Sequence, residues 1–111
     1  MSYIYKICPA DIWAEAEKDG VFSGSGIDLT DGFIHFSTKT QTAETLRLHF
    51  EGIHDLQLIQ IDADELDIVW EESRGGQLFP HLYGHVPVTK VTAIFDLELD
   101  KDGVHILPDM A

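Results

Sequence analysis

Two short segments of the chain gather the residue types that can carry out chemistry. Residues 78–87 (LFPHLYGHVP) hold His81, Tyr83 and His85, and they follow the flexible run at residues 73–76. Prolines fix φ and remove N–H donors, so we expect irregular backbone here rather than the interior of a helix or of a central strand. Rigid, irregular backbone that carries imidazole and phenol groups is typical of a binding or catalytic site.

The second segment, residues 32–38 (GFIHFST), brings His35, Ser37 and Thr38 to the end of an apolar run. A lone histidine in such a run is more often a hydrogen-bonded core residue. The two hydroxyl residues and the helix expected after them favour a site instead, because the first N–H groups of a helix attract anions. We therefore predict that the two segments share one cleft, lined by His35, Ser37, Arg74, His81 and Tyr83.

The residue types in this cleft indicate proton transfer and anion binding. Histidine exchanges protons near pH 7, so His35 and His81 are the candidate catalytic residues. Arg74 either pairs with an acidic side chain or holds a ligand anion. Tyr83 either packs in the core or stacks on a ligand. No metal is expected, because the glycine and prolines around His81 and His85 argue against a helical ligand pair, and the chain has no CxxC or HExxH motif.

Length and composition indicate one globular domain spanning residues 1–111. The chain is 44% hydrophobic, which is ordinary for a globular domain of this size. It has no apolar run near the roughly 20 residues that a membrane-spanning helix needs, and no signal peptide is visible at the start. The lone Cys8 cannot form an internal disulfide, which agrees with a reducing compartment. We therefore expect a cytoplasmic protein without a membrane partner.

The charge of the chain is strongly one-sided. Twenty acidic side chains stand against 7 basic ones, for a net charge of −13. Such a field repels polyanions, so we do not expect a nucleic-acid duplex as partner. A small anionic ligand held by one or two local cations stays compatible with it. No pattern in the sequence indicates an oligomeric state.

The expected elements place both segments in an α+β fold. Strand-like patterns occur at residues 2–7, 33–36, 56–61, 68–71, 91–99 and 104–107. Two amphipathic helices are expected, one after Pro9 and ending at Gly20, the other after a capping box of Thr38 and Gln41. Their predicted core faces are Ile12, Trp13 and Ala16, and Ala43, Leu46 and Phe50. Residues 23–26 (SGSG) are expected to be a loop. The order predicts a split, mainly antiparallel or mixed sheet with two helices from the N-terminal half.

The motifs IYKI, DGFIHFST and LFPHLYGHVP, in this order, resemble an uncharacterised bacterial family known as domain of unknown function 952. That family is grouped by remote similarity with the ADP-ribosyltransferase-like fold, which includes RNA 2′-phosphotransferases. The resemblance implies binding of NAD or a related nucleotide, with His35 stacking on or hydrogen-bonding the base. Lys6 and Cys8 stand where relatives resemble His-x-Thr, and Gln77 stands where relatives tend to carry Glu.

Two functions stay open on these grounds. The first is an enzyme that resembles ADP-ribosyltransferases or 2′-phosphotransferases. The alternative is a catalytically degenerate small-ligand-binding or regulatory protein, which the departures at Lys6 and Gln77 favour. The candidate ligand-binding residues are Lys6, Ser37, Thr38, Arg74, Gln77 and Tyr83. Lys6 and Arg74 are the cations that would neutralise an anionic ligand in so acidic a chain.

Overall fold

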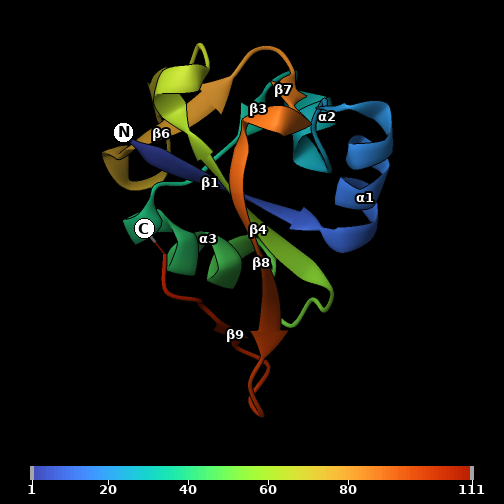
Figure 1. Ribbon diagram of the computed structural model, residues 1–111. Helices are drawn as coiled ribbons and strands as arrows, with labels where there is room; N and C mark the ends of the chain where they lie inside the picture. Colours follow the sequence, from blue (N-terminus) through green and yellow to red (C-terminus); the bar gives the residue numbers. More distant parts are fainter. Residues whose placement is uncertain (1, 111) are drawn as a thin grey trace.

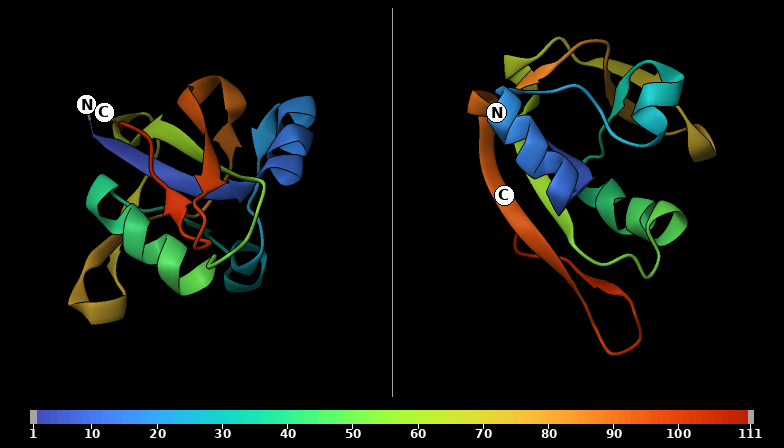
Figure 2. Two further views of the ribbon diagram at one scale, coloured as in Figure 1. Left: turned by 90° about the horizontal axis from the view of Figure 1, so that it is seen from below. Right: turned by 90° about the vertical axis from the view of Figure 1, so that its right-hand side faces the viewer.

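The computed structural model describes residues 2–110, with the side chain of Arg74 outside the described part. The described residues form an α+β domain with three antiparallel sheets (Figure 1). The largest sheet has the order β1-β4-β8-β9 and consists of β1 (Tyr3–Pro9), β4 (Leu56–Asp62), β8 (Val91–Leu99) and β9 (His105–Ile106). The hairpin of β8 and β9 projects beyond the rest of the molecule (Figure 2).

The second sheet carries the two segments singled out above. Its order is β3-β6-β5, with β3 (Ile34–His35), β6 (Leu78–Leu82) and β5 (Val69–Glu72). A backbone bridge joins it to the first sheet, because Tyr5 N–H donates to Ser37 O at 2.8 Å and Ser37 N–H donates to Tyr5 O at 2.9 Å. The smallest sheet pairs β2 (Val21–Phe22) with β7 (Val86–Pro87). The outer edge of β1 therefore lies beside the segment that follows β3.

Three α-helices accompany the sheets in the described part of the chain: α1 (Ala10–Asp19), α2 (Ile27–Asp31) and α3 (Thr42–His49). Helix α1 ends at Gly20, whose φ of 83° and N–H bond to Ala16 O form a left-handed cap. A 3-10 turn, Lys39–Gln41, precedes α3, and the capping box of Thr38 and Gln41 is confirmed. The third helix, α2, was not expected. It follows the SGSG loop directly, and five residues are too few to show a helical hydrophobic period.

Buried residues pack on both faces of the largest sheet. Successive residues of β1 point to opposite sides, so this strand contributes to two clusters. Ile4 and Cys8 pack with Trp13 of α1 in one buried cluster. Tyr5 and Ile7 pack in the other cluster, which also includes Leu46, Leu56, Leu58 and Leu97. Cys8 is free and fully buried. Burial raises the pKa of its thiol to about 11, so the group is a poor nucleophile.

Three local expectations were wrong. Ile12, predicted to belong to the core face of α1, is 37% exposed, and the buried residues of this helix are Trp13 and Ala16. Residues 78–82 are not irregular: they form β6, the central strand of its sheet, with Pro80 inside it. Pro80 O accepts from Phe36 N–H at 3.0 Å, and in an antiparallel strand the N of a residue points to the same neighbour as its carbonyl. Because proline has no N–H, the strand loses only the reciprocal hydrogen bond toward β3, at the end of that short strand. In α3, Ala43 is exposed, and the fully buried residue is Thr42.

Candidate functional site

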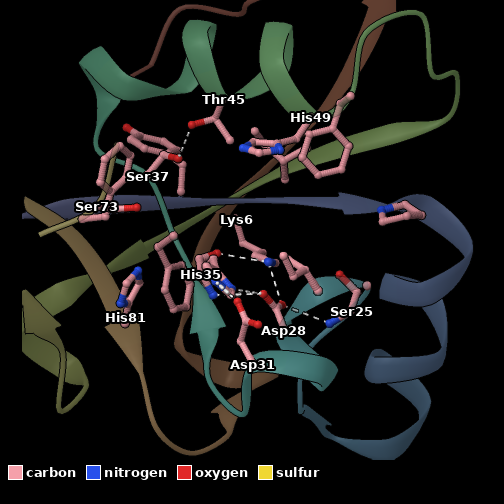
Figure 3. Close-up of a pocket in the computed structure, with 18 of the residues that line it drawn as sticks. Lys6, Ser25, Asp28, Asp31, His35, Ser37, Thr45, His49, Ser73 and His81 are labelled. Carbon is pink, nitrogen blue, oxygen red and sulfur yellow. Dashed lines mark hydrogen bonds and ion pairs between the residues drawn. The ribbon is translucent and has the colours of Figure 1, made fainter. Parts of the chain in front are cut away.

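A cavity of about 580 Å³ lies along the outer edge of β1 (Figure 3). Its polar lining comes from Lys6 on β1, Asp28 and Asp31 on α2, His35 and Ser37 at β3, and His81 on β6. Figure 3 shows Thr45 and His49 of α3 on the opposite side of β1 from Asp28 and Asp31. The cavity therefore joins elements from all parts of the chain up to β6.

The pairing of β3 with β6 brings the two predicted segments together. His35 and His81 are register partners in this antiparallel pair, so their side chains lie on the same face of the sheet. Their rings meet edge to face with centroids 5.2 Å apart. The ring of Phe33 lies 4.4 Å from each imidazole centroid. The paired histidines thus form a packed wall of the cavity.

Asp28 is the buried hub beneath His35. Its carboxylate accepts from the His35 Nδ1–H at 2.7 Å and pairs with the Lys6 ammonium at 2.7 Å. The backbone N–H groups of Ser25 and His35 each donate to it at 3.0 Å. Burial by itself would raise the pKa of Asp28, but the hydrogen bond from His35 and the charge of Lys6 outweigh burial and hold that pKa below 3.8. Asp28 is therefore an ionised acceptor.

Lys6 is buried because it occupies a core-facing position of β1. It lies between Ile4 and Cys8, which point to the same face, and its side chain is 7% exposed. Besides Asp28, its ammonium donates to His35 O at 3.0 Å. A buried ammonium is tolerated only with such partners. Lys6 therefore ties the first strand to α2 and β3 at the floor of the cavity.

His81 is anchored by a second carboxylate. Its Nδ1 lies 2.7 Å from Glu71 Oε1, and the Tyr83 hydroxyl donates to the same oxygen at 2.8 Å. The hydrogen bond from His81 has the larger effect and that from Tyr83 the smaller, and together they hold the pKa of Glu71 below its ordinary value. Because ionised Glu71 can only accept, the proton of a neutral His81 lies on Nδ1. Its Nε2, which makes no hydrogen bond to any described residue, is then a proton acceptor.

The predicted residues divide into those that line the cavity and those that do not. Lys6, His35, Ser37 and His81 line it, and the Ser37 hydroxyl lies 3.0 Å from that of Thr45. Tyr83, Thr38 and Gln77 are outside its lining as far as the structure describes it. The side chain of Arg74, predicted to hold a ligand anion, lies outside the described part.

The three residues outside the lining have structural partners. Tyr83 is exposed and holds Glu71. The N–H of Thr38 donates to Gln41 Oε1 at 3.0 Å. The capping box therefore satisfies N–H groups at the helix start, which were expected to face an anion. The amide of Gln41 donates to Gln77 Oε1 at 3.3 Å and to Leu78 O at 2.9 Å. Gln77 thus anchors the turn before β6 to the start of α3.

Six residues that the site brings together were missed at the level of sequence: Asp28, Asp31, Phe33, Thr45, His49 and Glu71. Asp28 and Asp31 lie in the unexpected helix α2. Glu71 reaches His81 diagonally across the β5–β6 pair, where Glu71 faces Phe79 and Val69 faces His81. A diagonal contact depends on strand register, which no pattern in residues 68–82 specifies. The local signals that could have indicated α2 are Asp28, an acidic residue in its first turn, and Gly32, which forms its left-handed cap.

Substituting Tyr83 by Phe tests the anchoring of His81. We expect the pKa of Glu71 to rise toward its ordinary value of 4.5, because one of its two hydrogen-bond donors is lost. Carboxyl NMR titration of Glu71 in the wild type and the variant measures this. The melting temperature is expected to change little, since Tyr83 is exposed. An unchanged Glu71 titration would show that the Tyr83 contact is not formed in solution.

Within residues 2–110, no group of three or more His, Cys, Asp or Glu side chains is placed to hold a metal ion. No helix in the same range is long and apolar enough to cross a membrane.

The fold and cavity define an α+β protein with two carboxylate-anchored histidines in one cleft. The chain belongs to a protein family of unknown function (DUF952), whose family model matches residues 7–94, and the resemblance noted from the motifs is confirmed. It is similar to protein CC0527 from Caulobacter crescentus. The crystal structure of that protein is 46% identical over 95% of this chain and 94% of that chain, with a TM-score of 0.91.

A solution NMR structure of CC0527 agrees with this likeness. It is 47% identical over 94% of this chain and 91% of that chain, with a TM-score of 0.84. At such identity and coverage the likeness extends over nearly the whole chain. No curated protein matches the chain.

Proposed function

We propose that the chain binds NAD or a related nucleotide in the cavity and that His35 and His81 act on this ligand. The observation that carries the proposal is the pair of adjacent imidazoles, each held by its own carboxylate, in a cavity of about 580 Å³. Small-molecule sites have volumes of about 300–1,000 Å³ and a few convergent polar groups. Anchored histidines of this kind are typical of acid–base catalysis.

The ADP-ribosyltransferase-like fold implied by the motifs is the framework of this proposal. It is supported by the split between the sheet of β1 and the sheet of β3, with the cavity along their junction. In that framework His35 contacts the base, and Ser37 faces a ribose or phosphate. Lys6 and Arg74 are the cations for the anionic linkage. The ammonium of Lys6 has two partners, so its third hydrogen is available to a ligand.

Glu71 and His81 supply the acid–base chemistry in the proposed mechanism. Glu71 holds the His81 proton on Nδ1, which leaves the lone pair of Nε2 to accept a proton from a ligand hydroxyl or from water. Glu71 also brings a carboxylate near the cavity, although position 77, where relatives tend to carry Glu, holds a glutamine. The carboxylate of Glu71 orients His81 and does not line the cavity itself.

The alternative is a protein that binds the ligand without turnover. Two observations favour it: Gln77 is engaged with Gln41 away from the cavity, and Lys6 is neutralised by Asp28. Both functions place a small ligand in the cytoplasm, in the same cavity. Neither calls for a nucleic-acid duplex, which the net charge of −13 would repel.

A thermal-shift panel of NAD, ADP-ribose and 2′-phosphorylated nucleotides tests the proposal. A ligand at 100 times its Kd should add about 2.7 kcal/mol to the free energy of unfolding, or several degrees in melting temperature. Chromatography of the same mixtures then separates the alternatives, because an enzyme consumes its ligand and a binding protein returns it unchanged. If no member of the panel raises the melting temperature, the nucleotide proposal is wrong.

A further inference from the structure

The two ring nitrogens of His35 contact two different carboxylates. Nδ1 lies 2.7 Å from Asp28 Oδ1, and Nε2 lies 3.1 Å from Asp31 Oδ2. The ionised Asp28 accepts a hydrogen bond from Nδ1–H, whereas Asp31 is in ionic contact with Nε2, and that contact is attractive when His35 is protonated. A protonated His35, with an N–H group on each ring nitrogen, can interact with both carboxylates at once.

The two carboxylates differ in what holds them. The side chain of Asp28 is 1% exposed and has four hydrogen-bonding or ionic partners. That of Asp31 is 36% exposed, and its one ionic contact within the described part of the chain is with His35. Removing Asp28 from His35 would leave a buried charge unpaired, whereas Asp31 can turn into water at little cost. Only the outer contact is exchangeable.

The charges around His35 determine which charge remains unpaired when Asp31 leaves Nε2. Lys6, from β1, is balanced by Asp28 at 2.7 Å, and on the other side Phe33 and the Glu71-bound His81 pack against the ring. The imidazolium is thus balanced by Asp31 alone. Without this carboxylate, the cavity would present an unpaired N–H donor with a positive charge at Nε2.

We infer that the Asp31 carboxylate occupies the place of a ligand oxyanion, and that His35 Nε2 is an anion-binding donor which Asp31 covers when no ligand is bound. This inference rests on the proposed function for its ligand, and it names the part of the ligand concerned: a phosphate or carboxylate oxygen. An incoming oxyanion takes over the contact with Nε2, and Asp31 moves into water. Asp31 therefore selects against weakly binding anions.

Inorganic phosphate is the probe that tests this inference without a nucleotide. Asp31→Ala should raise the affinity for phosphate about tenfold at low salt, because a competing charge is removed from the donor. The gain should fade as ionic strength rises. Asp19→Ala, an exposed position at the end of α1, removes the same charge elsewhere and should leave phosphate binding as in the wild type. Phosphate titration followed by the His35 ring signals in NMR gives both affinity and location.

Two further variants separate the loss of the Asp31 charge from a disturbance of α2 and test whether the gain in affinity depends on His35. Asp31→Asn should also strengthen phosphate binding, and it guards against a disturbance of α2 by alanine. Adding His35→Ala to Asp31→Ala should remove the gain. Equal phosphate affinities for Asp31→Ala, Asp31→Asn and Asp19→Ala, or His35 signals that do not move, would overturn the inference. If the gain occurs while no nucleotide stabilises the wild type, the anion site stands and the proposed function fails.

Discussion

Substituting Asp28 by Asn is expected to lower the free energy of unfolding by about 3–5 kcal/mol, the cost of breaking a buried ion pair. The Lys6 ammonium would remain buried without its charged partner, since its side chain is only 7% exposed. The amide NH₂ of an asparagine would also face the ammonium as a second donor. Urea unfolding of the wild type and the variant measures the difference.

A double substitution separates the charge effect from general damage to α2. Lys6→Met combined with Asp28→Asn removes both charges, so the double variant should be more stable than Asp28→Asn alone. A loss below about 1 kcal/mol for Asp28→Asn would contradict the buried hub, because that is the range of an exposed pair.

The same pair sets a pH dependence in the acid range. The pKa of Asp28 is lower in the folded protein than its ordinary 3.8. Its contribution to stability is therefore present above the unfolded pKa, and it is lost as the pH falls through the folded pKa. The difference in stability between wild type and Asp28→Asn should therefore shrink below about pH 4. Unfolding curves at several acidic pH values check this sign.

The second large effect is expected on ligand binding. His35→Ala and His81→Ala should each abolish the ligand-induced rise in melting temperature, a loss of about 2.7 kcal/mol at 100 times the wild-type Kd. The reason is that both rings line the cavity and lie 5.2 Å apart. Both variants should also melt at a lower temperature without ligand, because His35 donates to the buried Asp28 and His81 is itself buried, so the ligand-induced rise is measured relative to each variant's own unliganded melting temperature.

His54 provides the matched control for these substitutions. It is exposed and outside the lining of the cavity in the described structure, so His54→Ala should keep the full ligand response. Normal binding by both His35→Ala and His81→Ala would exclude the paired histidines as the binding site. A loss of response in His54→Ala as well would indicate a general effect on the fold.

The sequence predicts the scaffold well because its signals are local. The alternation of residues 91–99 matches β8, and Thr38 with Gln41 forms the expected capping box. The fold class depends on the number and order of such elements, so α+β with antiparallel sheets follows. The expected nearness of His35 and His81 agrees with their place as register partners.

The rest of the site depends on contacts that no local pattern specifies. Asp28 acts through Lys6, a charged residue at a core-facing position, and such a pair becomes apparent only when both elements are placed. Glu71 reaches His81 through strand register. Pro80 argued for irregular backbone, but its strand position costs only one hydrogen bond at the end of β3. In each case the arrangement depends on tertiary contacts that the local sequence pattern either contradicts or does not specify.

The most direct measurement is an NMR titration of the imidazole ring signals with ADP-ribose. The nucleotide-binding proposal predicts that the signals of His35 and His81 shift together and saturate at one Kd, while those of His54 and His105 stay in place. His105 serves as an internal reference because its ring is held by Ile53 O, outside the cavity. Unchanged His35 and His81 signals at millimolar ADP-ribose, or shifts confined to His54, His85 and His105, would show that the paired-histidine cavity is not a nucleotide site.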